Sequence, residues 1–184
     1  MEIINLVTPR LQIRNLKVTD LFDFHTYRSN PDVTRYQGFD VMSLEQAEEF
    51  IKAQTEKRFG KPGEWVQYGI EKKETGKIIG DCAIKLELND SRIAEIGITI
   101  SHLEQRKGYA KEVLFGILTF LFDVKGIHRV VEIVDVENTA SIKLLESSGF
   151  KKEGHFIENI FFKGKWGSEF QYAMLKREWD DNKS

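Results

Sequence analysis

One short segment, Gln105–Leu114, carries the residue types best suited to binding a phosphate group. It follows the apolar-rich run Ala94–Ile100, which is typical of a strand, and it leads into a strongly periodic helix. The first amides of a helix have no intrahelical acceptor, and the helix dipole adds partial positive charge there. Gly108 lets the backbone approach a ligand closely. The sequence therefore predicts an anion site at this turn, with added charge from Arg106, Lys107 and Lys111.

Two common phosphate-binding motifs do not fit this segment. A P-loop closes with Gly-Lys-Ser/Thr, whereas Gly108 is followed by Tyr109 and Ala110. A dinucleotide fingerprint needs three glycines in a G-x-G-x-x-G array, and only Gly108 lies in this turn. A different kind of phosphate site is the interpretation left standing.

Length and composition favour a single globular domain. The 184 residues, 41% hydrophobic and 30% charged, predict one domain over 1–184, and the net charge of −2 argues against nucleic-acid binding. The single cysteine, Cys82, and four dispersed histidines predict no metal site and no disulfide. With no secretory signal and no apolar run of about 20 residues, we expect a cytoplasmic protein that does not enter a membrane, as a monomer or a homodimer.

The hydrophobic patterning predicts an ordered series of elements. Alternating residues indicate strands, and apolar stripes at helical spacing indicate buried helix faces. Turn residues and caps mark the boundaries, for example the capping-box pattern that begins at Ser43 and the Gly149 stop. The predicted strands are 10–16, 65–71, 77–86, 92–101, 128–134, 150–162 and 168–176, and the predicted helices are 19–29, 43–59, 109–125 and 138–148.

The pattern Gln-x-x-Gly-x-Ala, filled by Gln105, Gly108 and Ala110, resembles the acyl-CoA pyrophosphate loop of GCN5-related N-acetyltransferases (GNAT). The element order also resembles that family along nearly the whole chain. This resemblance implies an α/β (α+β) fold with a mixed, mostly antiparallel sheet of about seven strands and four helices. The sheet should splay between its fourth and fifth strands.

Five local matches narrow the resemblance to the RimJ/RimL-like branch, which acetylates the N-termini of ribosomal proteins. They occur in the same order as in that branch and span the chain from end to end. The matches are Thr8–Arg14, Asn30–Tyr36, Ala94–Gly97, Asn138–Ser141 followed by Ser148–Phe150, and Leu175–Trp179.

The resemblance implies roles for particular residues. Backbone amides of the turn would hold the CoA pyrophosphate, the splayed strand would pair with the pantetheine arm, and Glu95 would take the amine proton through water. The Ser141 hydroxyl would lie near the CoA sulfur or phosphates. Because Leu145 stands where many relatives carry a tyrosine acid, Ser141 or water would have to protonate the thiolate. The implied acetyl-CoA-binding residues are Ile98, Thr99, Ile100, Gln105, Arg106, Lys107, Gly108, Tyr109, Ala110, Lys111, Asn138 and Ser141.

Ordinary structural roles compete with several of these assignments. Asn138 is also a good N-cap, and Glu95 could simply pair with Arg92 or Lys85 on the surface of the sheet. The weaker candidates for the base are Asp81, Glu153 and Glu158.

The predicted function is transfer of an acetyl group from acetyl-CoA to a primary amine. A weak base suffices for an α-amino group, because its pKa of about 7.7–8.0 leaves roughly a tenth of it neutral at pH 7. We therefore expect a protein or peptide N-terminus as acceptor. The alternatives are a small amine, such as a polyamine or an antibiotic, and a catalytically weak acyl-CoA-binding module.

Overall fold

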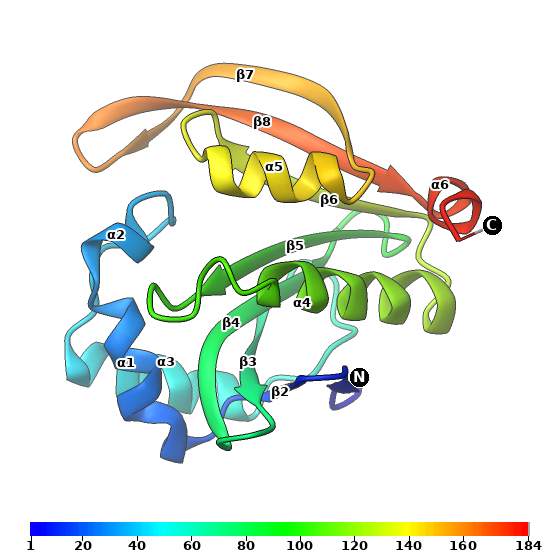
Figure 1. Ribbon diagram of the computed structural model, residues 1–184. Helices are drawn as coiled ribbons and strands as arrows, with labels where there is room; N and C mark the ends of the chain where they lie inside the picture. The colour runs from blue at the N-terminus through cyan, green and yellow to red at the C-terminus, as the bar shows by residue number, and fades with distance from the viewer. Residues whose placement is uncertain (184) are drawn as a thin grey trace.

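The computed structural model describes residues 1–183 and is built around one eight-stranded mixed sheet (Figure 1). The strands lie in the order β1-β2-β3-β4-β5-β6-β8-β7. All neighbouring pairs are antiparallel except β5 and β6. The strands are β1 (Asn5–Val7), β2 (Leu11–Asn15), β3 (Val66–Lys72), β4 (Lys77–Leu86), β5 (Ile93–Ile100), β6 (Arg129–Asp135), β7 (Lys151–Phe162) and β8 (Lys165–Leu175).

The single parallel pairing is also the place where the sheet opens. β5 and β6 pair over only three positions, and the last pair joins Glu95 to Val131. β5 then continues to Ile100 alongside β4, and β6 continues to Asp135 alongside β8. Beyond Glu95 the two strands diverge, so the inner edge of β5 has no strand partner there.

Helices cover the sheet in two groups (Figure 1). α4 and α5 flank the opening between β5 and β6, whereas α1 to α3 lie together beside β4. None of the described helices is long and apolar enough to cross a membrane. The helices are α1 (Leu21–Arg28), α2 (Pro31–Thr34), α3 (Leu44–Thr55), α4 (Tyr109–Leu118), α5 (Thr139–Ser147) and α6 (Lys176–Asp181), with a 3₁₀ turn η1 (Val18–Asp20) and a π-helical extension η2 (Thr119–Val124).

α4 is held by the apolar stripe that its sequence predicts. Val113, Leu114, Ile117 and Leu118 are fully buried in the main core, together with Leu121 of η2. Full burial of each such side chain stabilises the fold by about 1.5–3 kcal/mol. The stripe therefore anchors the helix against the sheet and fixes the position of its first turn.

The predicted fold class is confirmed, and so is the splay between the fourth and fifth predicted strands, which are β5 and β6 here. The sequence underestimated the number of elements. β1 has three residues and α2 has four, too few to show a period, and α6 begins at Lys176, where the last predicted strand ends, and was not predicted.

Candidate active site

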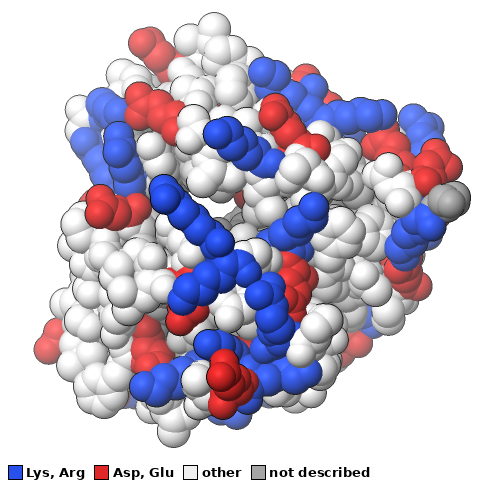
Figure 2. Space-filling view, viewed as in Figure 1, with Lys and Arg blue, Asp and Glu red and all other residues white. Residues whose placement is uncertain are grey.

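A cavity of about 440 Å³ lies in the opening between β5 and β6. In the space-filling view the molecule is hollowed there, and Lys and Arg side chains surround the hollow (Figure 2). Its walls come from α2, β5, the turn before α4, β6 and α5. The lining residues are Asp32, Val33, Tyr36, Gln37, Ile98, Thr99, Ile100, Glu104, Gln105, Arg106, Gly108, Tyr109, Ala110, Lys111, Glu132, Asn138, Ala140, Ser141 and Leu144.

The turn before α4 has the backbone shape of an anion-binding loop. Arg106 and Gly108 both adopt left-handed conformations, with φ of 62° and 80°. Alternation of left- and right-handed residues directs successive N–H groups into one concavity. At Arg106 this conformation is unusual, because side chains of L-residues disfavour positive φ. The unusual backbone therefore lies where the helix dipole also favours an anion.

Neighbouring side chains brace this turn. The Gln105 amide donates a hydrogen bond of 3.1 Å to the Ile100 carbonyl and so ties the turn to β5. Arg10 donates to the Lys107 carbonyl at 2.9 Å and to the Glu112 carboxylate at 2.6 Å. The Arg10 guanidinium also lies 4.4 Å from the centre of the Tyr109 ring. Sequence reasoning did not find Arg10, because its partners lie about a hundred residues away.

The three basic residues of the segment are not equivalent. Arg106 and Lys111 line the cavity, whereas Lys107 does not. The Lys107 ammonium donates to the Leu103 carbonyl at 3.0 Å and pairs with Glu104 at 2.8 Å. Two of the three predicted charges therefore face the site.

β5 contributes its backbone to the cavity. Ile98, Thr99 and Ile100 line the wall beyond the last β5–β6 pair. An open strand edge presents unpaired N–H and C=O groups that can pair with an extended ligand. The predicted site for the pantetheine amides thus coincides with the open part of the sheet.

The first turn of α5 forms the opposite wall. The Asn138 side-chain oxygen accepts from the Ser141 amide at 3.2 Å, so Asn138 is an N-cap. Its side-chain nitrogen forms no hydrogen bond within residues 1–183, and both Asn138 and Ser141 line the cavity. Leu145 is fully buried in the core, and the neighbouring Leu144 faces the cavity instead.

Glu132 of β6 is a buried acidic residue of the cavity wall that was not predicted from the sequence. The residue is only 7% exposed, and its Oε2 atom has no hydrogen-bond partner within the described chain. Burial, and then the charge of Glu95, raises the pKa of the Glu132 carboxyl from 4.5 to about 8. The available signal was one acidic residue inside the apolar strand Val-Val-Glu-Ile-Val.

Glu95 lies at the point of divergence but is not among the residues that line the cavity. It pairs with Lys85, its direct cross-strand neighbour on β4. Its role as base stays a prediction. Among the weaker candidates, Asp81 is fully buried and accepts hydrogen bonds from Tyr27 and Arg28, and Glu153 pairs with Arg129.

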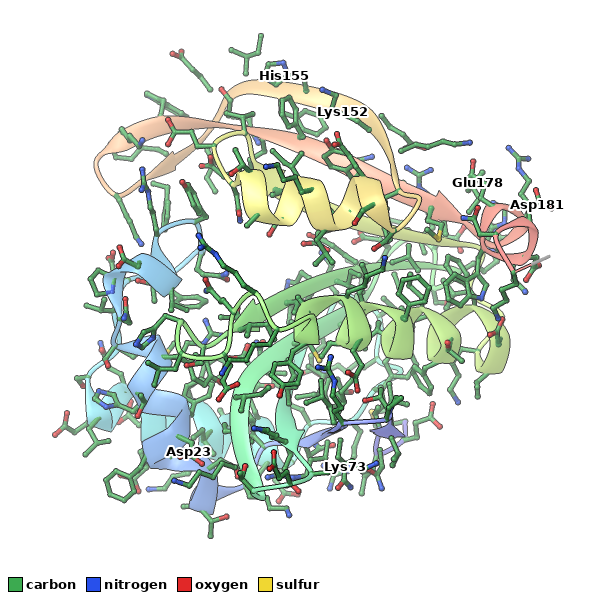
Figure 3. The ribbon with its side chains drawn as sticks, viewed as in Figure 1. Asp23, Lys73, Lys152, His155, Glu178 and Asp181 are labelled. Carbon is green, nitrogen blue, oxygen red and sulfur yellow. The ribbon has the colours of Figure 1, made fainter. Side chains whose placement is uncertain are left out.

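The remaining reactive side chains are distant or inaccessible. His155 and Lys152 lie on β7 at the outer edge of the sheet, away from the opening (Figure 3). Cys82 is fully buried, and burial raises the pKa of its thiol. Within residues 1–183, no cluster of three or more His, Cys, Asp or Glu side chains is arranged to hold a metal ion.

Comparisons with known proteins agree with this geometry. Residues 10–151 match the model of the Acetyltransferase (GNAT) domain. The chain is 30% identical to the N-acetyltransferase p20 of Bacillus licheniformis over 175 residues, which cover 95% of this chain and 97% of that one. It is 27% identical to the spermidine N(1)-acetyltransferase of Vibrio cholerae, over 92% of this chain and 95% of that one.

Among solved structures, a GNAT-family acetyltransferase from Bacillus anthracis superposes with a TM-score of 0.85 at 25% identity. The match covers 95% of this chain and 99% of that one.

Proposed function

The chain belongs to the GNAT family of acetyltransferases, and from this premise we propose that its acceptor is the α-amino group of a protein or peptide. Its relatives are acetyl-CoA-dependent N-acyltransferases, and its fold is theirs. Acetyl transfer in this cavity is supported most by one observation: a turn suited to an anion, an open strand edge and a buried carboxylate line the same cavity.

Two parts of the cavity suit two parts of acetyl-CoA, its pyrophosphate and its pantetheine arm. Amides of 106–110 would hold the pyrophosphate, with Gln105 bracing the turn and Arg106 and Lys111 adding charge. Farther in, the open edge of Ile98–Ile100 can pair with the pantetheine amides, and the Asn138 side-chain nitrogen can donate to a pantetheine carbonyl. A backbone N–H of this edge would stabilise negative charge on the thioester oxygen.

We assign to Ser141 the return of a proton to the CoA sulfur. It lines the cavity on the first turn of α5, and its hydroxyl can both donate and accept. Leu145 offers no such group. Glu95 remains the base that the resemblance implies, although Lys85 neutralises its charge.

An α-amine fits the chemistry of this site better than a lysine side chain does. Only a neutral amine attacks a thioester, and the pKa of about 7.7–8.0 makes an α-amine roughly 250 to 500 times easier to deprotonate than a lysine near 10.4. The five local matches to the RimJ/RimL-like branch favour the same acceptor. We place the reaction in the cytoplasm, where such N-termini emerge from synthesis.

A polyamine is the second candidate, and a specific observation favours it. The carboxyl groups of Asp32 and Glu104 line the cavity and would attract a polycation, and Glu132 would add its charge above about pH 8. The spermidine acetyltransferase of Vibrio cholerae is also a relative over nearly the whole chain.

A thiol-release assay with acetyl-CoA separates the candidates. The acceptors are peptides with a free N-terminus, the same peptides with a blocked N-terminus, spermidine and an aminoglycoside. We expect kcat/KM to be highest for the free peptides and near background for the blocked ones. Higher kcat/KM for spermidine would assign the polyamine, and CoA binding without turnover on any amine would leave only a binding module.

A further inference from the structure

Glu132 is the one buried ionisable side chain in the cavity whose partner is missing. It follows Val131, the last residue of β6 that pairs with β5, and so lies at the base of the opening. A buried carboxylate oxygen without a hydrogen bond costs free energy. A fold retains such a group at a functional site because it becomes useful when a ligand arrives.

We propose that Glu132 is the catalytic residue that takes the proton from the acceptor amine, and that Glu95 is a positioning residue that controls its protonation from the opposite face of the sheet. The inference rests on the proposed acetyl transfer. It assigns the proton to a residue that the family resemblance does not indicate in this chain.

Glu132 and Glu95 point to opposite faces of the sheet, because side chains alternate between the faces along each strand. On β6, Val130, Glu132 and Val134 are buried and alternate with the exposed Ile133. On β5, the buried Ala94 and Ile96 alternate with Glu95 in the same way.

The apolar members of these rows, Ala94, Ile96, Val130 and Val134, share one core with the buried residues of α4 and α5. Because successive side chains of a strand point to opposite faces, Glu132 faces the cavity side and Glu95 faces away from it.

The two carboxylates also differ in their partners. Lys85 pairs with Glu95 on its own face, and also with Glu87 at 3.1 Å. Glu95 therefore already has a counter-ion. Oε2 of Glu132 has no hydrogen-bond partner among residues 1–183 and is free to accept a proton from a bound amine.

The step balances as follows. The ammonium form of the acceptor gives one proton to Oε2 of Glu132, and the neutral amine nitrogen attacks the thioester carbon. The N–C bond forms and the C–S bond breaks, and the leaving thiolate takes the second proton of the nitrogen, with Ser141 placed to relay it. Glu132 then releases its proton to water. The products are the acetylated amine, free CoA and one proton.

The charge environment suits this step. A base works best when its pKa lies near the working pH, and burial raises the pKa of Glu132 to about 8. The charged and titratable groups around it are Glu95 from β5, Tyr172 directly opposite on β8 with its acceptor Glu146 from α5, and along the cavity walls Asp32, Glu104, Arg106 and Lys111.

The test measures kcat, kcat/KM and acetyl-CoA affinity from pH 6 to 10 for the wild type and matched variants on one active acceptor. Glu132→Gln keeps the size of the side chain and should lower kcat about 10²-fold, with acetyl-CoA affinity within about twofold of wild type. Glu132→Asp restores a carboxylate at a shorter reach and should recover part of that loss. Glu87→Gln removes a carboxylate from the same Lys85 and should leave kcat unchanged.

The position of the acidic limb of the profile distinguishes a base from a structural residue. In the wild type, kcat/KM should rise with pH up to about 8. Glu95→Gln removes a like charge and should move this limb to lower pH by roughly half a unit, whereas Lys85→Met exposes that charge and should move it to higher pH. A limb that belonged to the substrate amine would stay in place in every variant.

Each outcome decides something. Wild-type kcat in Glu132→Gln would overturn the inference alone, and so would a 10²-fold loss in Glu95→Gln with Glu132→Gln unaffected. A limb that moves in neither Glu95→Gln nor Lys85→Met would overturn the role of Glu95. A wild type that turns over no amine would overturn the proposed function, and this inference with it.

Discussion

The two strands that part at the cavity contribute different kinds of groups. The β5 side, with the turn before α4, offers mainly backbone: an open strand edge and the amides of 106–110. The β6 side, with α5, offers side chains, namely Glu132, Asn138 and Ser141. Most side-chain substitutions leave backbone contacts to a ligand in place, whereas a side-chain contact can be removed by a single substitution. Substitutions should therefore be able to change acetyl-CoA binding and the rate of acetyl transfer separately.

The largest effect should come from blocking the backbone wall. Gly108→Glu introduces a side chain at φ of 80° and a negative charge at the anion site, so acetyl-CoA affinity should fall at least about 100-fold. Isothermal titration measures this loss. Gly76→Glu is the matched control, because Gly76 has a φ of 69° and open space in the β3–β4 turn. Equal affinities in the two variants would remove the turn from the site.

A second effect concerns stability on the side-chain wall. The raised pKa of Glu132 means that the folded chain keeps a proton there that the unfolded chain releases above about pH 4.5. The wild type should therefore lose stability as pH rises from about 4.5 to 8, and Glu132→Gln should not. We expect the variant to melt at least about 5 °C higher at pH 9, for a gain of at least about 2 kcal/mol, and within about 2 °C of wild type at pH 5.

Thermal melts across that pH range measure the difference. A constant gap between the two proteins at every pH would show that the carboxyl does not titrate in this window.

Asn138 should show a smaller, specific effect. Asn138→Ala loses both the cap and the side-chain nitrogen, so acetyl-CoA affinity should fall about tenfold and stability by about 1 kcal/mol. Asn138→Asp keeps an oxygen for the Ser141 amide but has no nitrogen donor. It should restore stability without restoring affinity. Full recovery of both in titrations and melts would make Asn138 only a cap.

The smallest effect separates two lysines that look alike in the sequence. Lys111 lines the cavity and Lys107 pairs with Glu104, so Lys111→Ala should weaken acetyl-CoA binding about threefold at low salt. Lys107→Ala should change it by less than about 1.5-fold. Similar losses of acetyl-CoA affinity in both variants would show that the basic residues attract the ligand through their summed charge and not through their individual positions.

The sequence predicted those helices and strands that are long enough to show a hydrophobic period. In α4, β4 and β5 the pattern extends over several periods, so it indicates whether each segment is a helix or a strand. β1 and α2 are three and four residues long and form through tertiary pairing that no local pattern contains.

The site was predictable to the extent that it is local. The turn Gln105–Ala110 is a contiguous signal, and most of the residues that the resemblance implied line one cavity. Arg10 and Glu132 were not predictable, because their roles depend on neighbours that are distant in sequence. In the sequence, Arg10 is a charged residue at the start of a predicted strand, and Glu132 is one residue within a predicted strand. Only the structure shows that β5 and β6 diverge there and that the buried Glu132 Oε2 has no hydrogen-bond partner in residues 1–183.

Amide hydrogen exchange with and without acetyl-CoA tests most directly the claim that the backbone of β5 and its turn forms the binding wall. We expect acetyl-CoA to slow exchange in residues 96–110, and Gly108→Glu to remove this protection while its other amides exchange as in the wild type. A second groove, lined by Asn5–Pro9 and α4, serves as the internal comparison and should not change. Protection at that groove, with none in residues 96–110, would show that β5 and its turn do not bind acetyl-CoA.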